Sequence, residues 1–360
     1  MATKFLFLIF LCFGILGVFV QTQFLFPKCY PNVKQRCDTK RIDRSWTNTT
    51  MRFLLFTRRN PQEPELLHLC NGTLPKNSNF KAQNRFIVFI PGFMFGVCEL
   101  DSISEIKDEL LNKGDFNVLL VDGKEEYGMD FVYAKENSKR AANIIIKVLQ
   151  NIQDETGFKN KDLYLIGHSL GAHTAGMVGQ GFKVNRITGL DPGGVVFSKN
   201  TPDNMILDRN DAELVDVIHT NGGKGLPHLG ISFPMGDADF YVNGGTIQPS
   251  CSYRAWNSIK SLNFLYLLGM ASVPSICAHA QCLEYYKLSI SNVYGKFIGF
   301  PCSSYKKFQS GQCTIDGATN VTMGFEFEKD FTPKQHGKKS VKYYVTTSSS
   351  WPFVSSKKFK

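Results

Sequence analysis

Short apolar runs and amphipathic stretches alternate along the first two thirds of the chain. Between the runs, Ser102 and Glu105 predict a capping box for a helix that Gly114 ends, and residues 133–156 predict a longer helix. Continuous apolar strands separated by helices predict a parallel sheet that is covered on both faces. After about residue 220 the pattern becomes rich in loops. The runs that predict buried strands cover residues 86–90, 116–122, 163–166, 187–191 and 214–220.

Near its N-terminus the chain has one basic residue, Lys4, followed by an unbroken apolar run from Phe5 to Val20. Such a beginning is typical of a secretory signal, which we predict over residues 1–21. A membrane anchor is the alternative, since the run is close to the shortest length that spans a bilayer. Residues 22–51 are then an N-terminal extension. The 360 residues, of which 43% are hydrophobic, suffice for one large globular domain or two modest ones.

Secretion changes how the cysteines are interpreted. Of the 10 cysteines, Cys12 lies in the predicted signal, which leaves an odd number in an oxidising compartment where most should pair. One cysteine is therefore free or bonded to another chain, and no Cys-x-x-Cys pair with a matching ligand set predicts zinc. Sequons for N-glycosylation fit the same compartment and stand at Asn48, Asn71 and Asn320.

The formal net charge is +10 and the isoelectric point is near 9.0. No arginine-rich helix or nucleic-acid-binding motif accompanies this charge, so we expect no nucleic-acid partner. The basic residues gather toward the C-terminus, where residues 354–360 form a basic tail. Two interpretations are open: a solvated face with a frayed tail, or a surface that is attracted to anionic lipid.

One motif indicates chemistry through its context. Gly167-His168-Ser169-Leu170-Gly171 stands between a predicted strand and a predicted helix, which is the context of a nucleophile elbow. Such a turn needs glycines for its backbone angles and close approaches, and it lifts the serine hydroxyl above the sheet edge. The hydroxyl is a weak nucleophile unless a histidine removes its proton and a carboxylate orients that histidine.

An acid and a histidine should therefore follow Ser169 in the chain. Asp191 ends the next predicted strand and so lies at the same carboxyl edge of the sheet. For the histidine, spacing leaves His219, His228 and His279 open. His279 is modestly favoured because the cysteine before it can anchor its loop.

The sequence resembles the secreted animal lipase family that includes pancreatic and lipoprotein lipases and the wasp-venom phospholipases. The segments GHSLGAH, RITGLDP, DVIHT, DFYVNGG and CAH…YY match family segments in family order, and the resemblance runs from Arg52 to Phe353. It implies an α/β-hydrolase fold with a central, mostly parallel sheet, flanking helices and a lid over the active site. This lipase domain would occupy residues 52–353, without the β-sandwich domain of the larger lipases.

The resemblance implies roles for individual residues. Ser169 would be the nucleophile, Asp191 its acid and His279 the base. The backbone N–H groups of Phe93 and Leu170 would form the oxyanion hole, where donors stabilise the charge that develops on the carbonyl oxygen. No cofactor is required for this chemistry.

Family pairs imply two disulfides, Cys251–Cys277 and Cys302–Cys313. The sequence does not assign partners to Cys29, Cys37, Cys70, Cys98 and Cys282.

The sequence departs from the family pattern near the predicted site. The oxyanion turn reads Pro91-Gly92-Phe93 where His-Gly-Phe is usual, and Val121-Asp122-Gly123 lacks an aromatic residue. Gln281 stands where an arginine is common, and an extra cysteine, Cys282, follows it. These departures keep open a non-enzyme alternative, a catalytically weak lipase-like protein that binds lipid or steroid. Against it, all three members of the triad are present.

Family members that bind calcium use carboxylates in the segment that corresponds to residues 201–213. Asp203, Asp208 and Asp211 match these positions together with the carbonyl of Ile206, and calcium favours such oxygen ligands. The resemblance therefore implies a structural calcium ion. The alternative is that Asp208 and Asp211 only cap turns.

The segment between Cys251 and Cys277 corresponds to the family's lid. Its apolar residues fall at roughly helical intervals, so the lid can move an apolar face from the pocket to a lipid interface, and a plain surface helix is the alternative. These residues are Trp256, Ile259, Leu262 and Tyr266.

The resemblance implies a secreted carboxylic ester hydrolase that acts on acylglycerols at a membrane or emulsion surface. The long lid favours this substrate. The missing β-sandwich domain instead resembles the venom enzymes, so a phospholipase A1 that releases the sn-1 fatty acid of phospholipids is the second candidate. The sequence predicts no particular oligomeric state.

Overall fold

The computed structural model describes residues 51–68, 71–92, 101–123, 133–223, 227–251, 273–313, 318–331 and 340–355. Several predictions lie outside the described residues. These are the signal, the N-terminal extension apart from Met51, most of the basic tail, and the residues Phe93, Asn48, Cys29, Cys37, Cys70, Cys98, Trp256, Ile259, Leu262 and Tyr266.

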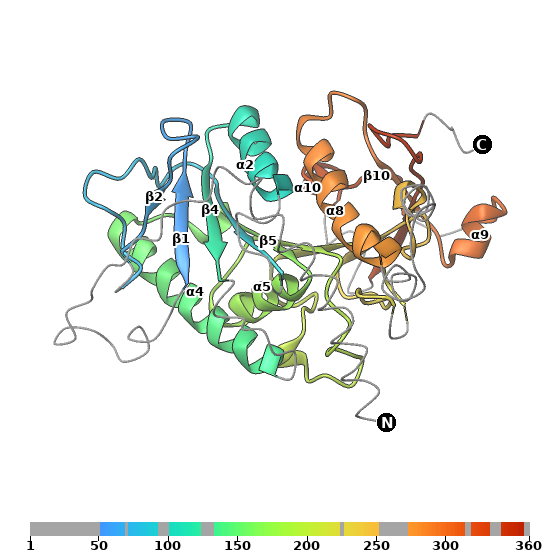
Figure 1. The fold of residues 1–360 in the computed structure, drawn as a ribbon, viewed down its shortest axis with the longest axis horizontal. Helices are drawn as coiled ribbons and strands as arrows, with labels where there is room; N and C mark the ends of the chain where they lie inside the picture. Colours follow the sequence, from blue (N-terminus) through green and yellow to red (C-terminus); the bar gives the residue numbers. More distant parts are fainter. Residues whose placement is uncertain are drawn as a thin grey trace, which may run out of the picture.

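Helices and strands alternate through much of the described chain (Figure 1). The strands are β1 (Arg52–Phe56), β2 (Glu65–Leu66), β3 (Phe86–Ile90), β4 (Asn117–Asp122), β5 (Leu163–His168), β6 (Arg186–Leu190), β7 (Leu214–His219), β8 (Ala238–Val242), β9 (Ile298–Pro301), β10 (Val321–Thr322) and β11 (Val341–Val345). The helices are α2 (Asp101–Lys113), α4 (Ala134–Thr156), α5 (Leu170–Gly181), α8 (Val273–Ser291), α9 (Tyr305–Gln309) and α10 (Phe327–Asp330), with short 3-10 turns η3 (Asn160–Asp162) and η4 (Asp203–Met205).

All of these strands join one 11-stranded sheet, in the order β10-β9-β11-β8-β7-β6-β5-β3-β4-β1-β2. From β11 to β4 every neighbouring pair is parallel, and the strands beyond β11 and β4 pair antiparallel. The chain order reverses around β3, which lies between β4 and β5. Open sheets of this kind bind ligands beyond the carboxyl ends of the strands near such a reversal. The carboxyl end of β5 is therefore a favoured position for a site.

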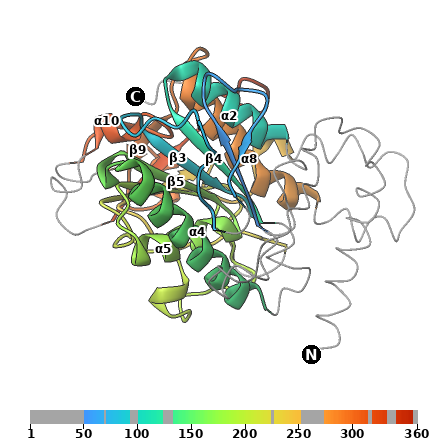
Figure 2. The same cartoon turned by 90° about the vertical axis from the view of Figure 1, so that its left-hand side faces the viewer.

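Helices cover the sheet on both faces, as Figures 1 and 2 show. Strand side chains alternate between the faces, so that Val88 of β3 packs in the core beneath α4 and α5, whereas Ile87 packs on the opposite side beneath α2 and α8. Both cores are apolar and buried, which explains why the strands are continuous apolar runs. The five predicted strands and the two-sided cover are confirmed.

The part of the chain after about residue 220 is rich in loops, as predicted, but it also holds regular elements that the sequence pattern did not identify. Strands β8, β9 and β11 and the long helix α8 all follow this point. Helix α8 has buried residues on most sides, since the consecutive residues Gln281, Cys282 and Leu283 and also Tyr285 and Ser289 are all buried. A helix that is buried nearly all round lacks the apolar and polar alternation by which an amphipathic helix is found.

The capping box at the start of α2 is wrong. Ser102 lies inside the helix, and its hydroxyl donates to Glu284 on α8 at 2.7 Å instead of to a backbone group of its own helix end. Glu105 accepts from Lys287, again on α8. Both side chains therefore join two helices that pack side by side on one face of the sheet (Figure 1).

Two disulfides close loops in the second half of the chain. Cys251 is bonded to Cys277 and Cys302 to Cys313, which are the pairs that the resemblance implied. Among the described cysteines Cys282 is free, and it is buried in α8. The sequon residues Asn71 and Asn320 are exposed, as an attached sugar requires.

In the described part of the chain, none of the helices has the length and apolar character needed to cross a bilayer.

Candidate active site

Ser169 occupies the single-residue turn between β5 and α5. Its backbone angles are φ 54° and ψ −119°, a region that non-glycine residues rarely adopt. The turn is tight on both sides: a Cβ at Gly167 would lie 2.4 Å from the carbonyl oxygen of Gly171, and one at Gly171 would lie 2.1 Å from that of Ile90. Both glycines of the motif are therefore required by space.

Three side chains from separate elements form a hydrogen-bonded chain at the carboxyl edge of the sheet. The Nε2 atom of His279 lies 2.7 Å from the Oγ atom of Ser169, and its Nδ1 atom lies 2.6 Å from the Oδ2 atom of Asp191. Because an ionised carboxylate only accepts, Nδ1 carries the proton and donates it to Asp191, which leaves Nε2 to accept from the serine hydroxyl. This is the arrangement that makes a serine nucleophilic.

The location of His279 differs from the prediction. It lies in the first turns of α8, two residues after the disulfide-bonded Cys277, and not in a loop. The helix and the disulfide together restrict where the imidazole can lie.

Asp191 follows β6 directly and is fully buried. Its Oδ1 atom accepts hydrogen bonds from the backbone N–H groups of Thr220, at 2.7 Å, and Asn221, at 3.0 Å. Both donors follow β7, the strand that pairs with β6. A buried charge needs such donors, since it has lost its water. The sequence analysis did not identify these two residues. The available signal was that they directly follow the predicted strand next in the chain after the one that Asp191 ends.

Glycines keep the space beside the serine open. A Cβ at Gly92 would lie 2.8 Å from the Cβ atom of Ser169, and one at Gly193 would lie 3.4 Å from its Oγ atom. The same Cβ at Gly193 would lie 3.4 Å from the backbone nitrogen of Leu170. Leu170 is the first residue of α5, so its N–H has no acceptor within the helix.

The other histidines near Ser169 have different partners. His173 accepts from the N–H of Leu207 at Nδ1 and donates from Nε2 to the carbonyl of Gly193, 2.8 Å away, which fixes it as a neutral imidazole. His219, one of the alternatives for the base, uses Nε2 toward Asp239 and Nδ1 toward the carbonyl of Ile231, both at 2.8 Å. Of the three candidates, His279 is the one that contacts Ser169.

Burial gives the fold a defined dependence on acid. It lowers the pKa of His168 to about 3 and that of His173 to about 4. Both stay neutral in the folded chain while they charge near pH 6.5 when unfolded, so their contribution to stability is full above that pH and is lost as the pH falls. We expect each histidine to lower the free energy of unfolding by about 2 kcal/mol between pH 7 and pH 5. Burial raises the pKa of Asp211 to about 7, which acts in the opposite direction over this range, so the contribution of one histidine is measured as the difference between wild type and a variant in urea denaturation.

His173→Gln provides the control, because glutamine can accept from Leu207 and donate to Gly193 but does not titrate. Over the same range the variant should lose about 2 kcal/mol less stability than wild type, and an unchanged pH dependence would contradict the assignment.

The calcium prediction is not supported. Within the described ranges, no group of three or more histidine, cysteine or acidic side chains could hold a metal ion. Asp211 accepts from the N–H of Asp208 and from Gln180, and Asp208 accepts from the N–H of Asn210. These bonds match the alternative in which Asp208 and Asp211 cap a turn. Neither Asp203 nor the carbonyl of Ile206 takes part in them.

A mostly parallel sheet covered by helices on both faces, with a Ser-His-Asp chain at its carboxyl edge and the serine in a strand-to-helix turn, defines the α/β-hydrolase class. The predicted fold class is confirmed, and the predicted lid lies outside the described residues. The family model described as Lipase matches residues 19–353. The chain therefore belongs to the lipase family.

Relatives of known name support this assignment. Pancreatic lipase-related protein 2 of Myocastor coypus is 32% identical over 343 residues, which cover 94% of this chain and 70% of that protein. The Homo sapiens protein of the same name is 33% identical over 351 residues, covering 96% and 72%. Inactive pancreatic lipase-related protein 1 of Homo sapiens is 34% identical over 265 residues, covering 73% and 56%. Membership of the lipase family supports an ester hydrolase. The last of these relatives is named inactive, so family membership alone does not establish activity.

Solved structures superpose only in part. A phospholipase/carboxylesterase from Dyadobacter fermentans is 13% identical, covers 42% of this chain and 72% of its own, and gives a TM-score of 0.30. The α/β hydrolase MGS-M1 from a deep-sea metagenome library is 18% identical, covers 49% and 67%, and gives 0.29.

Proposed function

We propose that this protein is a serine carboxylic ester hydrolase that cleaves acylglycerols at a lipid interface. The observation that carries the proposal is the hydrogen-bonded chain from Ser169 through His279 to Asp191. A protein that only bound lipid would have no need of an imidazole held against a serine hydroxyl in a strained turn.

The proposed reaction proceeds through an acyl-enzyme. The Oγ atom of Ser169 attacks the ester carbonyl carbon while Nε2 of His279 takes its proton, and the N–H groups of Leu170 and Phe93 stabilise the resulting oxyanion. The carbon–oxygen bond to the alcohol then breaks, and His279 returns the proton to the departing alcohol oxygen. Water repeats the sequence on the acyl-enzyme and releases the fatty acid. Asp191 orients the imidazole and stabilises its charged form in both halves.

Secretion and lipid contact form part of the same proposal. The disulfides at Cys251–Cys277 and Cys302–Cys313 fit an oxidising compartment, and the exposed sequons at Asn71 and Asn320 fit glycosylation there. The proposed chemistry requires no cofactor.

The test uses purified wild type beside Ser169→Ala, on triacylglycerol emulsions and on phosphatidylcholine vesicles, with fatty-acid release as the measurement. Hydrolysis by wild type alone supports the enzyme. Faster release from triacylglycerol supports the acylglycerol lipase, and faster sn-1 release from phosphatidylcholine indicates a phospholipase A1. Equal and negligible release by both proteins would support the lipid-binding alternative.

A further inference from the structure

Gln248 is a fully buried side chain whose hydrogen-bonding capacity is completely used. Its Nε2 atom donates to the carbonyl oxygens of Thr220, at 2.8 Å, and Val242, at 3.0 Å. Its Oε1 atom accepts from Asn243, at 2.8 Å, and Tyr285, at 3.1 Å. A primary amide offers two donor hydrogens and two acceptor lone pairs, so no capacity is left over.

One of these bonds acts on the peptide unit that binds the proposed acid. The carbonyl of Thr220 and the N–H of Asn221 belong to the same planar, trans peptide, so they point in opposite directions. The amide of Gln248 donates to the carbonyl at one edge of this peptide, and Asp191 accepts from the N–H at the opposite edge. Rotation of the peptide away from Asp191 would break the bond to Gln248 as well.

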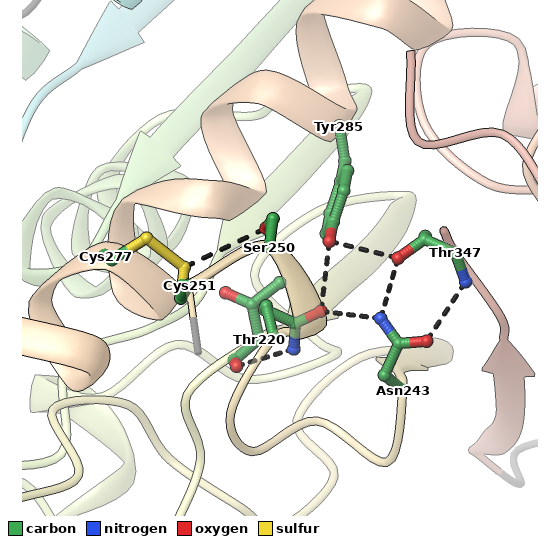
Figure 3. Close-up of a disulfide and its surroundings, with 8 residues drawn as sticks. Thr220, Asn243, Ser250, Cys251, Cys277, Tyr285 and Thr347 are labelled. Atoms are coloured by element: carbon green, nitrogen blue, oxygen red, sulfur yellow. Dashed lines mark hydrogen bonds between the residues drawn. A yellow bond between two sulfur atoms is a disulfide. The ribbon is translucent and has the colours of Figure 1, made fainter. Parts of the chain in front are cut away.

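A second bond reaches the helix that carries the proposed base. Tyr285 lies six residues after His279 on α8, which is roughly 9 Å along the helix axis. Its hydroxyl points into the same cluster as Thr220, Asn243 and Thr347 (Figure 3). The disulfide Cys251–Cys277 adds a covalent connection from this segment to α8, which carries Cys277. Cys251 lies three residues after Gln248, and its N–H donates to the carbonyl of Gln248.

We propose that Gln248 is a positioning residue that aligns the peptide holding Asp191 with the helix that carries His279. The inference rests on the proposed function, since it assigns Gln248 a part in the same reaction. Gln248 touches neither the substrate nor the reacting atoms and acts only through Thr220 and Tyr285.

The residue type follows from the geometry. Thr220 and Val242 present carbonyl oxygens, which only accept, so the amide nitrogen must face them. Methionine has nearly the shape of glutamine but neither donates nor accepts strongly, so Gln248→Met removes the four bonds while it preserves packing.

A matched control lies at the amino ends of the strands, away from the site. Asn117 begins β4, is fully buried, and donates from its amide to the carbonyls of Lys81, at 2.8 Å, and Asn84, at 3.4 Å. Asn117→Leu removes a comparable buried amide with conserved shape, far from the carboxyl ends of the strands.

The experiment compares wild type, Gln248→Met and Asn117→Leu with p-nitrophenyl butyrate below its aggregation limit. We expect Gln248→Met to lower kcat about 10-fold, with KM within about twofold of wild type, because the peptide it releases would lose the hydrogen bond from the N–H of Asn221 to the carboxylate of Asp191. The rate of Ser169 phosphorylation by diethyl p-nitrophenyl phosphate should fall in parallel, because it depends on the same activated hydroxyl. Asn117→Leu should lower Tm to a similar degree without changing kcat.

Three results would overturn the assignment: an unchanged kcat in Gln248→Met, a change confined to KM, or an equal loss of kcat in Asn117→Leu. If Gln248→Met does not fold, Tyr285→Phe tests the same alignment from the helix side, with an expected loss of kcat of about two- to threefold. Absence of turnover by wild type would instead refute the proposed function, and the inference with it.

Discussion

Alanine in place of Ser169 is expected to abolish ester hydrolysis, with kcat lower by about 10⁶-fold. The substitution removes the only atom that attacks the ester in the proposed reaction, and no other hydroxyl is hydrogen-bonded to Nε2 of His279 among the described residues. Fatty-acid release measured in a pH-stat, at equal concentrations of folded protein, provides the test.

Ser138→Ala is the matched control for this loss. Ser138 is buried in α4, where its hydroxyl donates to the carbonyl of Ala134, so the same atom is removed away from the site. Its activity should equal that of wild type. Residual activity of Ser169→Ala above about one thousandth of wild type would show that another residue is the nucleophile.

Asp191→Asn tests the second member of the chain. The amide oxygen can still accept from Thr220 and Asn221, but the amide nitrogen would face Nδ1 of His279 and favour the tautomer whose Nε2 already carries a proton. We expect kcat to fall about 10⁴-fold with little change in KM. A loss below tenfold would refute the proposed role of Asp191.

Arg186→Met is expected to destabilise the fold by about 3–5 kcal/mol, the largest loss of stability that we predict. Arg186 and Asp216 are both fully buried, and the guanidinium donates to the carboxylate at 2.8 Å and 3.2 Å. It also donates to the carbonyls of Gly324 and Phe325, each at 2.8 Å. Removal of the arginine leaves a buried carboxylate and two buried carbonyls without these donors. Urea denaturation with a constant m-value measures the loss.

Two variants separate charge burial from packing in this prediction. Arg186→Met combined with Asp216→Leu removes both charges and should recover part of the stability, because no unpaired ion is left. Lys183→Met breaks the pair of Lys183 with Glu213, whose side chains are 71% and 62% exposed, and should cost less than about 1 kcal/mol. Equal losses in Lys183→Met and Arg186→Met would contradict the argument.

The sequence alone determined those features that depend on neighbouring residues along the chain. The buried parallel strands are continuous apolar runs, since both of their faces are covered, and their limits agree with the prediction to within about two residues. The turn at Ser169 was predictable because its steric requirement falls on Gly167 and Gly171, two positions away. The order of serine, acid and histidine then limited the partners to a few residues.

Only the tertiary structure decided which groups meet across the chain. It places His279 on a helix whose burial hides its periodicity, and it directs Ser102 to α8 instead of to a cap. It also brings the N–H groups of Thr220 and Asn221 to Asp191 and the amide of Gln248 to the carbonyl of Thr220. It gives Asp208 and Asp211 hydrogen-bonded turns where calcium ligands were predicted. The physical reason is that the partner of each of these groups depends on how distant strands, helices and loops pack together, and the residues next to the group in the sequence do not record that packing.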